Sequence, residues 1–406
     1  MQKNKSLIYD IALGLITSIL FTTFIYLEHF GITLKLLNTL FGIISLALFL
    51  YIPKKSILVA GFNIGLLWFY WIGYSFEYQG VGYMTPIITF GFAIIYMLFF
   101  GVLALSDKVY IRAILLFSLS FFEPFDWNWL QIELIFVDSY IGVLKYQLAI
   151  VIVALSVPKY LPQPYRFMPL ILLLLTLNFT PTLQKNSPID IKLIQTDIKQ
   201  EKKWLRESLK PTVEYIFQEI EIAIDEEYKI IIFPESVFPI YMNKNQKLVD
   251  ELLTYSKDIS IVAGSLYIDE EKNNNYNVTY MFEDGTYQIA KKLVLVPFGE
   301  YIPLPKFAQK FINETFFSGA SDFLTADEPT DFIIQGVKFR NAICYEATCQ
   351  EIYEGDVDFV IATSNNAWFS PSIEPTIQKL LMRYYARKNG ATIYHSANWS
   401  GTGIIK

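Results

Sequence analysis

The chain has 406 residues, of which 53% are hydrophobic and 18% charged, and its formal net charge is −6. Soluble domains have about 25% charged residues and about 45–50% apolar ones, so this composition excludes a disordered chain and a wholly soluble enzyme. Residues 1–188 hold 11 basic and 8 acidic side chains, whereas residues 189–406 hold 22 and 31. We therefore expect a membrane half followed by a soluble half. The acidic soluble half argues against nucleic acid as a partner, because phosphate binding needs a basic surface.

Apolar segments in the first half are candidates for membrane-spanning helices. A helix needs about 20 apolar residues to cross the hydrocarbon core. Seven segments approach this length, at 8–27, 34–52, 56–75, 85–106, 109–128, 139–157 and 167–182. The sequence therefore predicts an N-terminal transmembrane domain of about seven helices over residues 1–183.

Basic residues alternate between the connections of these segments. They precede the first span and follow the second, fourth and sixth, as Lys3, Lys5, Lys54, Lys55, Lys108, Arg112, Lys159 and Arg166. Because Lys and Arg mark cytoplasmic loops, seven spans place the chain after residue 183 outside. We expect a protein of the bacterial inner membrane whose second half lies in the periplasm.

The connection between the fifth and sixth spans is rich in acidic and aromatic residues. Its carboxylates are Glu123, Asp126, Glu133 and Asp138. We interpret them as a solvated loop at the outer side, with a polar lining for a lipid headgroup as the alternative. Two tryptophans of the same connection, Trp127 and Trp129, fit an interfacial aromatic belt.

The second half, residues 189–406, alternates between two kinds of pattern. Strand patterns occur at 189–196, 229–236, 259–268, 277–292, 338–346, 354–366 and 391–401. Helix patterns occur at 201–225, 243–256 and 375–390. Strands that alternate with helices predict an α/β fold in which helices cover the sheets. Functional groups in such folds lie just beyond the ends of strands.

Chemically useful side chains follow three of the predicted strands. FPES contains Glu235, the segment IAKKLVLVPFGEYIP contains Lys292 and Glu300, and ICYE contains Cys344. A cysteine nucleophile needs a base and a group that stabilises the oxyanion. Glu235 suits the first task and Lys292 the second. Singly, each also suits an ordinary role, as a strand cap, a surface charge or a buried thiol.

Together, the motifs FPES, K-x-x-L-V-P-F-G-E and ICYE, in this order and at these intervals, resemble the nitrilase (carbon–nitrogen hydrolase) superfamily. With its apolar first half, the chain resembles the bacterial apolipoprotein N-acyltransferase family within that superfamily. IQTDIKQEKKW (194–204) and SNNAWF (364–369) extend the similarity, which covers almost the whole chain. The resemblance implies a membrane domain joined to an α-β-β-α sandwich over residues 189–406.

The resemblance also implies roles for individual residues. It makes Glu235 the general base, Lys292 the catalytic lysine and Cys344 the nucleophile. Residues that support the acyl site are Glu300, Tyr345 and Glu346, and residues that contact the acyl chain or a lid are Trp204 and Trp368.

The implied reaction has two halves. The cysteine takes an acyl chain from a membrane phospholipid as a thioester. The N-terminal amine of a diacylglyceryl-modified apolipoprotein then takes the chain as an amide. We expect neither a metal nor a diffusible cofactor, and the sequence does not indicate an oligomeric state.

Three other interpretations remain open from the residues. One is a Cys-His hydrolase that pairs Cys344 with His395. Another is a membrane-anchored nitrilase-type amidase with the same three catalytic residues. The third is a transporter or scaffold that carries a degenerate appended domain.

Two further expectations concern the second half. The aromatic-rich segment 311–324 suits either a lid that dips into the membrane interface or core packing. The family that the chain resembles usually continues past the point that corresponds to residue 406 with a few more strands and a last membrane span, so we expect either a short lineage or a truncated sequence.

Overall fold

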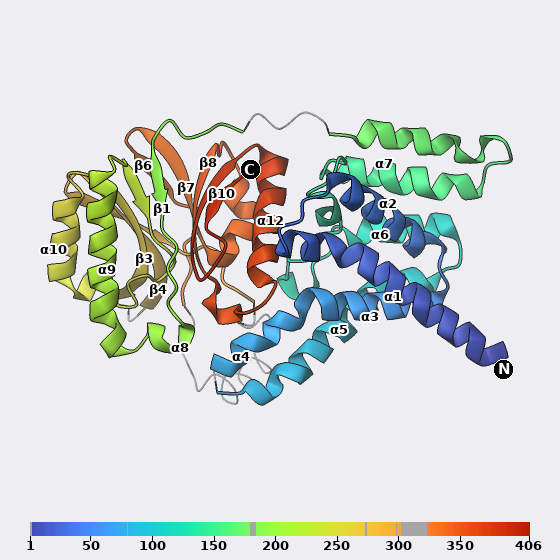
Figure 1. Cartoon of the computed structure of the whole chain (residues 1–406), viewed down its shortest axis with the longest axis horizontal. Helices are drawn as coiled ribbons and strands as arrows, with labels where there is room; N and C mark the ends of the chain where they lie inside the picture. Colours follow the sequence, from blue (N-terminus) through green and yellow to red (C-terminus); the bar gives the residue numbers. More distant parts are fainter. Residues whose placement is uncertain (1, 79, 179–183, 273, 298, 302–322) are drawn as a thin grey trace. The chain divides into compact units, whose positions relative to one another are not determined.

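The computed structural model describes all residues except 1, 79, 179–183, 273, 298 and 302–322. It forms two compact units, Met1–Pro181 and Thr182–Lys406 (Figure 1). The first unit is helical and the second contains two sheets with covering helices, as predicted. Of the predicted lid or core segment 311–324, all but the last two residues lie outside the described part.

The first unit consists of helices that are mostly apolar. The α-helices are α1 (Gln2–His29), α2 (Lys35–Tyr51), α3 (Lys54–Phe69), α4 (Ser75–Tyr78), α5 (Thr85–Gly101), α6 (Val109–Leu119) and α7 (Lys145–Ser156). The 3-10 helices are η1 (Tyr70–Tyr74), η2 (Gly82–Met84), η3 (Val102–Leu105), η4 (Pro124–Asp126), η5 (Ile132–Phe136), η6 (Val157–Lys159) and η7 (Tyr165–Thr176).

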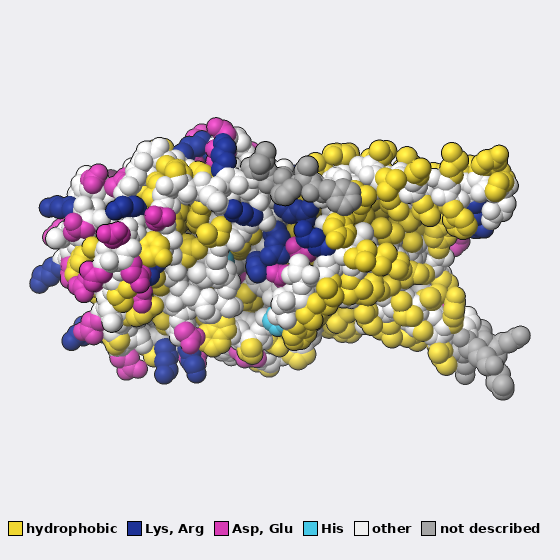
Figure 2. Space-filling view, turned by 45° about the horizontal axis from the view of Figure 1, so that its top comes forward, with side chains coloured by type: hydrophobic (Ala, Val, Ile, Leu, Met, Phe, Trp, Pro, Cys, Tyr) yellow, Lys and Arg dark blue, Asp and Glu magenta, His cyan; other side chains and the backbone are white. Residues whose placement is uncertain are grey.

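Within the described residues, three helical stretches are long and apolar enough to cross a membrane: Ser6–His29, Lys54–Tyr78 and Gly82–Leu105. They coincide with three of the seven predicted spans. Hydrophobic side chains cover most of the visible face of this unit, whereas charged side chains gather on the second unit (Figure 2). Exposed side chains such as Leu98 and Ile114 therefore suit a lipid environment.

Three of the predicted spans differ from the observed helices, and the last of them, 167–182, is the 3-10 helix η7, which ends at Thr176. The predicted helix 109–128 ends at Leu119, and the predicted helix 139–157 begins at Lys145. At 1.5 Å per residue, helices of this length cover about 16–18 Å, which is less than the apolar core of about 30 Å. Glu123 precedes Pro124, and a residue before proline disfavours helical geometry. The Gln147 side chain accepts the Leu144 N–H and starts α7 at that point.

The segment between α6 and α7 is largely buried, which corrects the prediction of a solvated loop. Glu123 and Asp126 are exposed, but Glu133 and Asp138 are buried. Glu133 Oε1 forms an ion pair with Lys145 Nζ at 2.6 Å. A buried carboxylate needs such a partner to offset the loss of hydration.

The two tryptophans of this segment are also buried, so the expected interfacial belt is wrong for them. The ring of Trp129 lies 4.9 Å from that of Trp71, measured between centroids. The Trp129 carbonyl accepts a hydrogen bond from Trp68 Nε1 at 3.0 Å. The aromatic rings therefore belong to the core of the helical unit.

The second unit contains two five-stranded sheets. The first has the order β1-β2-β3-β4-β5 and the second the order β10-β9-β8-β7-β6. The first comprises β1 (Ile191–Leu193), β2 (Ile230–Ile232), β3 (Ser260–Asp269), β4 (Asn274–Glu283) and β5 (Thr286–Lys291). The second comprises β6 (Asp331–Ile334), β7 (Val337–Ile343), β8 (Phe359–Asn365), β9 (Thr392–Asn398) and β10 (Gly403–Ile405). The pairs β1–β2, β2–β3, β7–β8 and β8–β9 are parallel.

Helices connect and cover these strands. The α-helices are α8 (Gln200–Lys203), α9 (Arg206–Asp225), α10 (Gln246–Tyr255) and α12 (Glu374–Asn389). The 3-10 helices are η8 (Met242–Lys244), η9 (Cys344–Thr348), η10 (Gln350–Tyr353) and η11 (Asn366–Phe369). In Figure 1, α9 and α10 cover one sheet and α12 covers the other.

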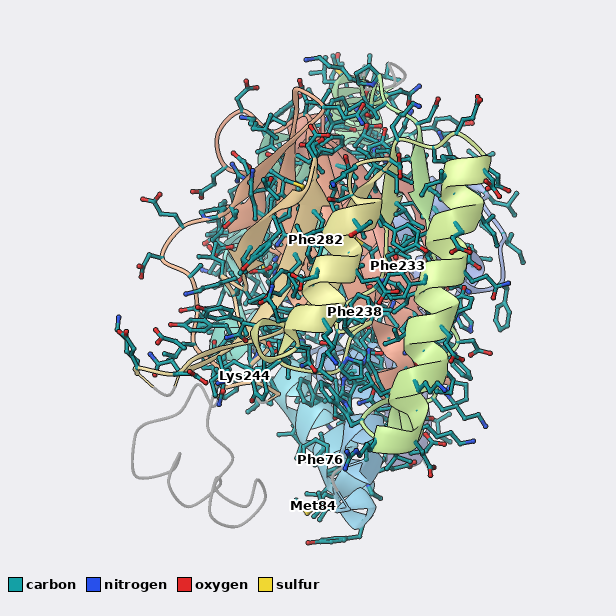
Figure 3. All side chains as sticks on the ribbon, turned by 90° about the vertical axis from the view of Figure 1, so that its left-hand side faces the viewer. Phe76, Met84, Phe233, Phe238, Lys244 and Phe282 are labelled. Carbon is teal, nitrogen blue, oxygen red and sulfur yellow. The ribbon has the colours of Figure 1, made fainter. Side chains whose placement is uncertain are left out.

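The strands bury both faces of each sheet, which explains the α-β-β-α layering. Alternate residues of a strand point to opposite faces. On β2, Ile231 packs under the helices, while Ile230 and Ile232 pack between the sheets with Phe339 and Phe359 of the second sheet. Under α9 and α10, Figure 3 shows Phe233, Phe238 and Phe282, all of which belong to the helix-side core. The predicted fold class is confirmed.

Candidate active site

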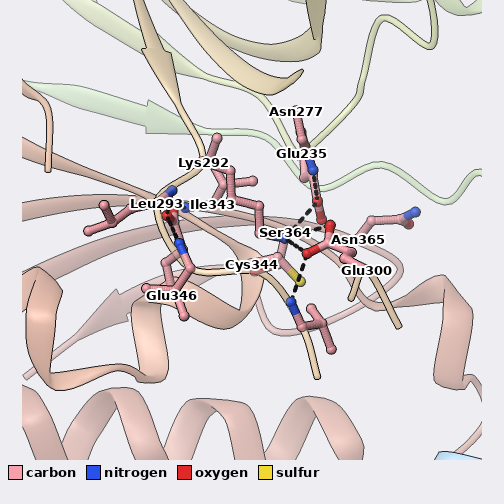
Figure 4. Close-up of polar contacts among 12 residues, drawn as sticks. Glu235, Asn277, Lys292, Leu293, Glu300, Ile343, Cys344, Glu346, Ser364 and Asn365 are labelled. Carbon is pink, nitrogen blue, oxygen red and sulfur yellow. Dashed lines mark hydrogen bonds and ion pairs between the residues drawn. The ribbon is translucent and has the colours of Figure 1, made fainter. Parts of the chain in front are cut away.

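Three predicted site residues lie just beyond the ends of strands, two in the first sheet and one in the second. Glu235 follows β2 and Lys292 follows β5 in the first sheet, and Cys344 follows β7 in the second. The structure brings them together at one end of the sandwich (Figure 4). The expectation that strand ends carry the chemistry therefore holds for the placement of all three.

Cys344 sits at a strained turn between β7 and η9. Its φ angle of 57° lies in the left-handed region, which non-glycine residues rarely adopt. The side chain is partly exposed. Burial and the Glu235 carboxylate raise the pKa of the thiol well above its ordinary value, and Lys292 opposes them. The resting thiol is therefore protonated, and a nearby base must remove its proton for attack.

Lys292 is completely buried between two carboxylates. Its Nζ donates to Glu300 Oε1 at 2.8 Å and lies 4.0 Å from Glu235 Oε1. Burial lowers the pKa of this lysine, but the carboxylates of Glu300 and Glu235 outweigh burial and raise it above its ordinary value. Lys292 is therefore a cation beside the Cys344 thiol. Glu300 is itself fixed because its Oε2 accepts the Val296 N–H at 2.9 Å.

Sequence reasoning missed two neighbours of Glu235. Asn277 Nδ2 donates to Glu235 Oε1 at 2.8 Å and orients the carboxylate. Lys203 Nζ donates to the Glu235 carbonyl oxygen at 2.9 Å. Burial lowers the pKa of Lys203 to about 8, against the raising effects of Glu235 and Cys344. The motif IQTDIKQEKKW contains the lysine pair Lys202–Lys203, but the sequence alone does not show which of the two lysines is buried.

The close approach of β3 to the Glu235 turn requires a glycine. A Cβ atom on Gly264 would lie 2.4 Å from the Ser236 nitrogen and 2.7 Å from Glu235 Cα. We expect Gly264→Ala to displace Glu235 and to lower kcat about 100-fold, because misplacing a catalytic group by about 1 Å can cost this much. Steady-state rates measure the effect, and an unchanged kcat in a folded variant would contradict it.

Glu346 supports the site by joining two of its segments. Its Oε1 accepts the backbone N–H groups of Leu293 and Val294, the latter at 3.0 Å, and its Oε2 accepts that of Ile343. It therefore ties the segment after Lys292 to the end of β7. Burial raises the pKa of Glu346 to about 7, while Lys292 and the three N–H groups lower it.

The remaining predicted residues lie near the site in different environments. Tyr345 is buried next to Cys344, and its carbonyl accepts the Thr348 hydroxyl at 2.7 Å. Trp204 is 48% exposed at the end of α8, directly after Lys203, and Trp368 is partly exposed in η11. Contact of these two tryptophans with an acyl chain stays a prediction.

The geometry of His395 argues against the Cys-His interpretation. Its Nδ1 lies 2.8 Å from the Gly401 carbonyl oxygen and its Nε2 lies 2.8 Å from Ser364 Oγ. Both ring nitrogens are thus engaged away from Cys344. Burial lowers the pKa of His395 to about 4, although the Gly401 carbonyl raises it. A neutral, fully bonded imidazole is a structural residue here.

The depressed pKa of His395 predicts a loss of stability in acid. The unfolded histidine binds a proton below about pH 6.5, whereas the folded one does so only below about 4. The contribution is present above pH 6.5 and is lost as the pH falls toward 4, by roughly 2 kcal/mol between pH 7 and 5. His395→Asn should show a smaller decrease in melting temperature over this range. An equal decrease would contradict the assignment.

Among the described residues, no group of three or more His, Cys, Asp or Glu side chains is placed to hold a metal ion.

Comparison with known proteins identifies the family. Residues 8–179 match the model of the apolipoprotein N-acyltransferase integral membrane domain, and residues 193–401 match that of carbon-nitrogen hydrolase. An apolipoprotein N-acyltransferase from Wolinella succinogenes is 42% identical over 98% of this chain and 96% of its own length. The chain belongs to the apolipoprotein N-acyltransferase family.

A second relative agrees with this membership. An apolipoprotein N-acyltransferase from Helicobacter hepaticus is 36% identical over 91% of this chain and 94% of its own. A solved CN-hydrolase superfamily protein from Xanthomonas campestris is 14% identical with a TM-score of 0.40, over 52% of this chain and 76% of that one. As a member of the apolipoprotein N-acyltransferase family, the chain is a membrane protein and an acyltransferase, and the amidase and scaffold interpretations are not favoured.

Proposed function

We propose that the chain transfers a fatty acyl group from a membrane phospholipid, through a thioester on Cys344, to the N-terminal amine of a diacylglyceryl-modified apolipoprotein. The observation that carries the proposal is the meeting of a thiol, a buried cation and a carboxylate at three strand ends. Glu235, Lys292 and Cys344 supply these groups. The apolar first unit supports lipids as the source of the acyl group.

The first half-reaction forms the thioester. Glu235 takes the proton of the Cys344 thiol, and the sulfur attacks the ester carbonyl of the phospholipid. The oxyanion that develops faces the Lys292 ammonium, a preformed charge in a site with little water. The carbon–oxygen bond breaks, and the lysophospholipid leaves as an alcohol after taking the proton from Glu235.

The second half-reaction forms the amide. The amine nitrogen attacks the thioester carbonyl, and Glu235 takes a proton from that nitrogen. The carbon–sulfur bond then breaks, and the proton passes to the sulfur of Cys344. A thioester suits this exchange because a thiolate leaves more readily than an alkoxide.

We further propose that the protein resides in the bacterial inner membrane with its second unit in the periplasm. The alternation of Lys and Arg between the connections of the first half supports this orientation. Alkaline phosphatase, which is active only outside the cytoplasm, fused after Lys406 should be active. An inactive but intact fusion would contradict the orientation.

Intact mass spectrometry tests the acyl-transfer proposal. The full chain is incubated with vesicles of phosphatidylethanolamine and phosphatidylglycerol. We expect an adduct of one acyl chain that hydroxylamine removes. A diacylglyceryl-modified peptide with a free N-terminus should then discharge the adduct and become N-acylated, whereas the N-acetylated peptide should not.

Two results would contradict the proposal. A folded protein that forms no adduct with any vesicle excludes the thioester. Release of free fatty acid at the same rate with and without the peptide would favour the hydrolytic, amidase-like alternative.

A further inference from the structure

One face of α12 lies beside the nucleophile. Gln378 Nε2 is 4.0 Å from Cys344 Sγ, and Gln378 Oε1 accepts a hydrogen bond from Asn366 Nδ2 at 3.1 Å. Glu374 precedes Gln378 by four residues, so that both side chains leave the same face of the helix. The Glu374 side chain is therefore directed toward the same side of α12 as the thiol.

The Glu374 carboxyl has an unused acceptor. The residue is only 1% exposed, and its Oε2 is buried without a hydrogen-bond partner in the described structure. Leaving such an atom unpaired destabilises a folded protein, and native proteins satisfy nearly all buried polar atoms. An atom of this kind beside a reactive thiol indicates a missing ligand that donates a hydrogen bond.

The protonation state of Glu374 restricts that ligand. Burial, and then the Glu235 carboxylate, raise the pKa of Glu374 well above its ordinary value. Both effects favour the neutral form of the Glu374 carboxyl. A neutral carboxyl accepts a hydrogen bond through its carbonyl oxygen without introducing a second buried charge.

Of the two substrates in the proposed reaction, only one brings a hydrogen-bond donor to the reacting carbon. The phospholipid ester presents acceptor oxygens there. A primary amine presents N–H groups together with the lone pair that attacks. The unused oxygen of Glu374 therefore suits the second substrate rather than the first.

We propose that Glu374 positions the acceptor: its Oε2 accepts an N–H hydrogen bond from the primary amine and directs the lone pair at the thioester carbon on Cys344. This inference rests on the proposed function. An N-terminal amine has a pKa of about 7.7–8.0, so a substantial share enters as the neutral form after losing a proton to water. The carbon–nitrogen bond forms, the carbon–sulfur bond breaks, and the second proton passes through Glu235 to the sulfur. Glu374 keeps its proton throughout.

Separate measurement of the two half-reactions tests this role. The full chain in phosphatidylethanolamine vesicles is acylated, and adduct formation is timed by intact mass. Discharge is then timed against increasing diacylglyceryl peptide. Glu374→Ala should form the adduct within about 2-fold of the wild-type rate, but its kcat/KM for discharge should fall about 10- to 100-fold, as for the loss of one hydrogen bond to the reacting group.

Two further variants complete the test. In Glu374→Gln, which keeps a neutral acceptor oxygen, kcat/KM for discharge should stay within about 3-fold of the wild-type value. Glu351→Ala, an exposed glutamate on η10, is the matched control and should match the wild type in both steps.

Several outcomes would overturn the inference. Unchanged discharge in Glu374→Ala would do so, as would a loss of both steps by one factor, which is the effect of a structural residue. A Glu374→Gln variant as slow as Glu374→Ala would mean that the carboxyl proton is needed. If the alanine variant does not fold, Glu374→Asp serves instead, because withdrawing the oxygen by one methylene should still slow discharge selectively, and a normal rate would refute the role. A wild-type protein without any adduct overturns the proposed function and this inference together, whereas a normal wild type with an unaffected Glu374→Ala overturns this inference alone.

Discussion

Cys344→Ala is expected to form no acyl adduct and to lose acyl transfer by a factor on the order of 10⁴ or more, because removing the nucleophile removes the covalent pathway itself. The geometry supports this dependence. The thiol lies at a turn with φ of 57°, a conformation that the chain adopts at a cost and that sets the direction of the side chain. Intact mass after incubation with phospholipid vesicles measures the adduct directly.

The second cysteine offers a matched control. Cys349 is buried, and its sulfur donates to the Tyr345 carbonyl at 3.4 Å. Cys349→Ala removes a small buried side chain and should cost stability, about 1–2 kcal/mol, while the adduct still forms. An adduct that persists in Cys344→Ala and disappears in Cys349→Ala would reverse the assignment of the nucleophile.

The positions of the three proposed catalytic residues could be predicted because each lies within a local sequence pattern. Glu235, Lys292 and Cys344 follow apolar runs that fold as strands, and a motif marks each position. The alternation of strand and helix patterns is also local and predicted sheets covered by helices, whereas the α-β-β-α order was implied by the resemblance. The sequence was therefore sufficient to predict the position of residues that local patterns determine.

The contacts of the site could not be predicted because tertiary packing creates them. Asn277 reaches Glu235 across 42 positions of sequence, and Glu374 reaches the thiol side only through the docking of α12. No motif contains either residue. From the sequence, a single Asn on a strand and a single Glu before a helix are interpreted as ordinary surface residues.

For a related reason, the prediction failed for the segment between α6 and α7, whereas three of the seven predicted spans coincide with long apolar helices. Hydropathy treats an apolar residue in a helix and one in a buried irregular segment alike, so both ends of this segment were assigned to predicted spans. The burial of this segment depends on the ion pair of Glu133 with Lys145, a contact between residues 12 positions apart. A hydropathy average over a window of residues counts the two charges as interruptions of an apolar segment and cannot detect that they pair.

Lys292→Met should reduce adduct formation about 1,000-fold or more, because it removes the preformed cation that faces the oxyanion while keeping the length of the side chain. The adjacent Lys291 is the matched control. Its Nζ lies 3.9 Å from the centroid of the Tyr276 ring, outside the carboxylate pair. Lys291→Met should form the adduct at close to the wild-type rate, and equal losses in both variants would refute the specific role of Lys292.

The same substitution should also destabilise the protein, for a reason that can be separated from catalysis. Lys292 is the buried partner of Glu300 at 2.7 Å, and removing one partner of a buried pair costs about 3–5 kcal/mol. Glu300→Gln in the Lys292→Met background removes the charge left without a partner, and the amide oxygen can still accept the Val296 N–H. The double variant should therefore recover much of the melting temperature but none of the acylation rate. Recovery of both would mean that Lys292 acts only by neutralising Glu300, and recovery of neither would mean that the pair does not hold the site together.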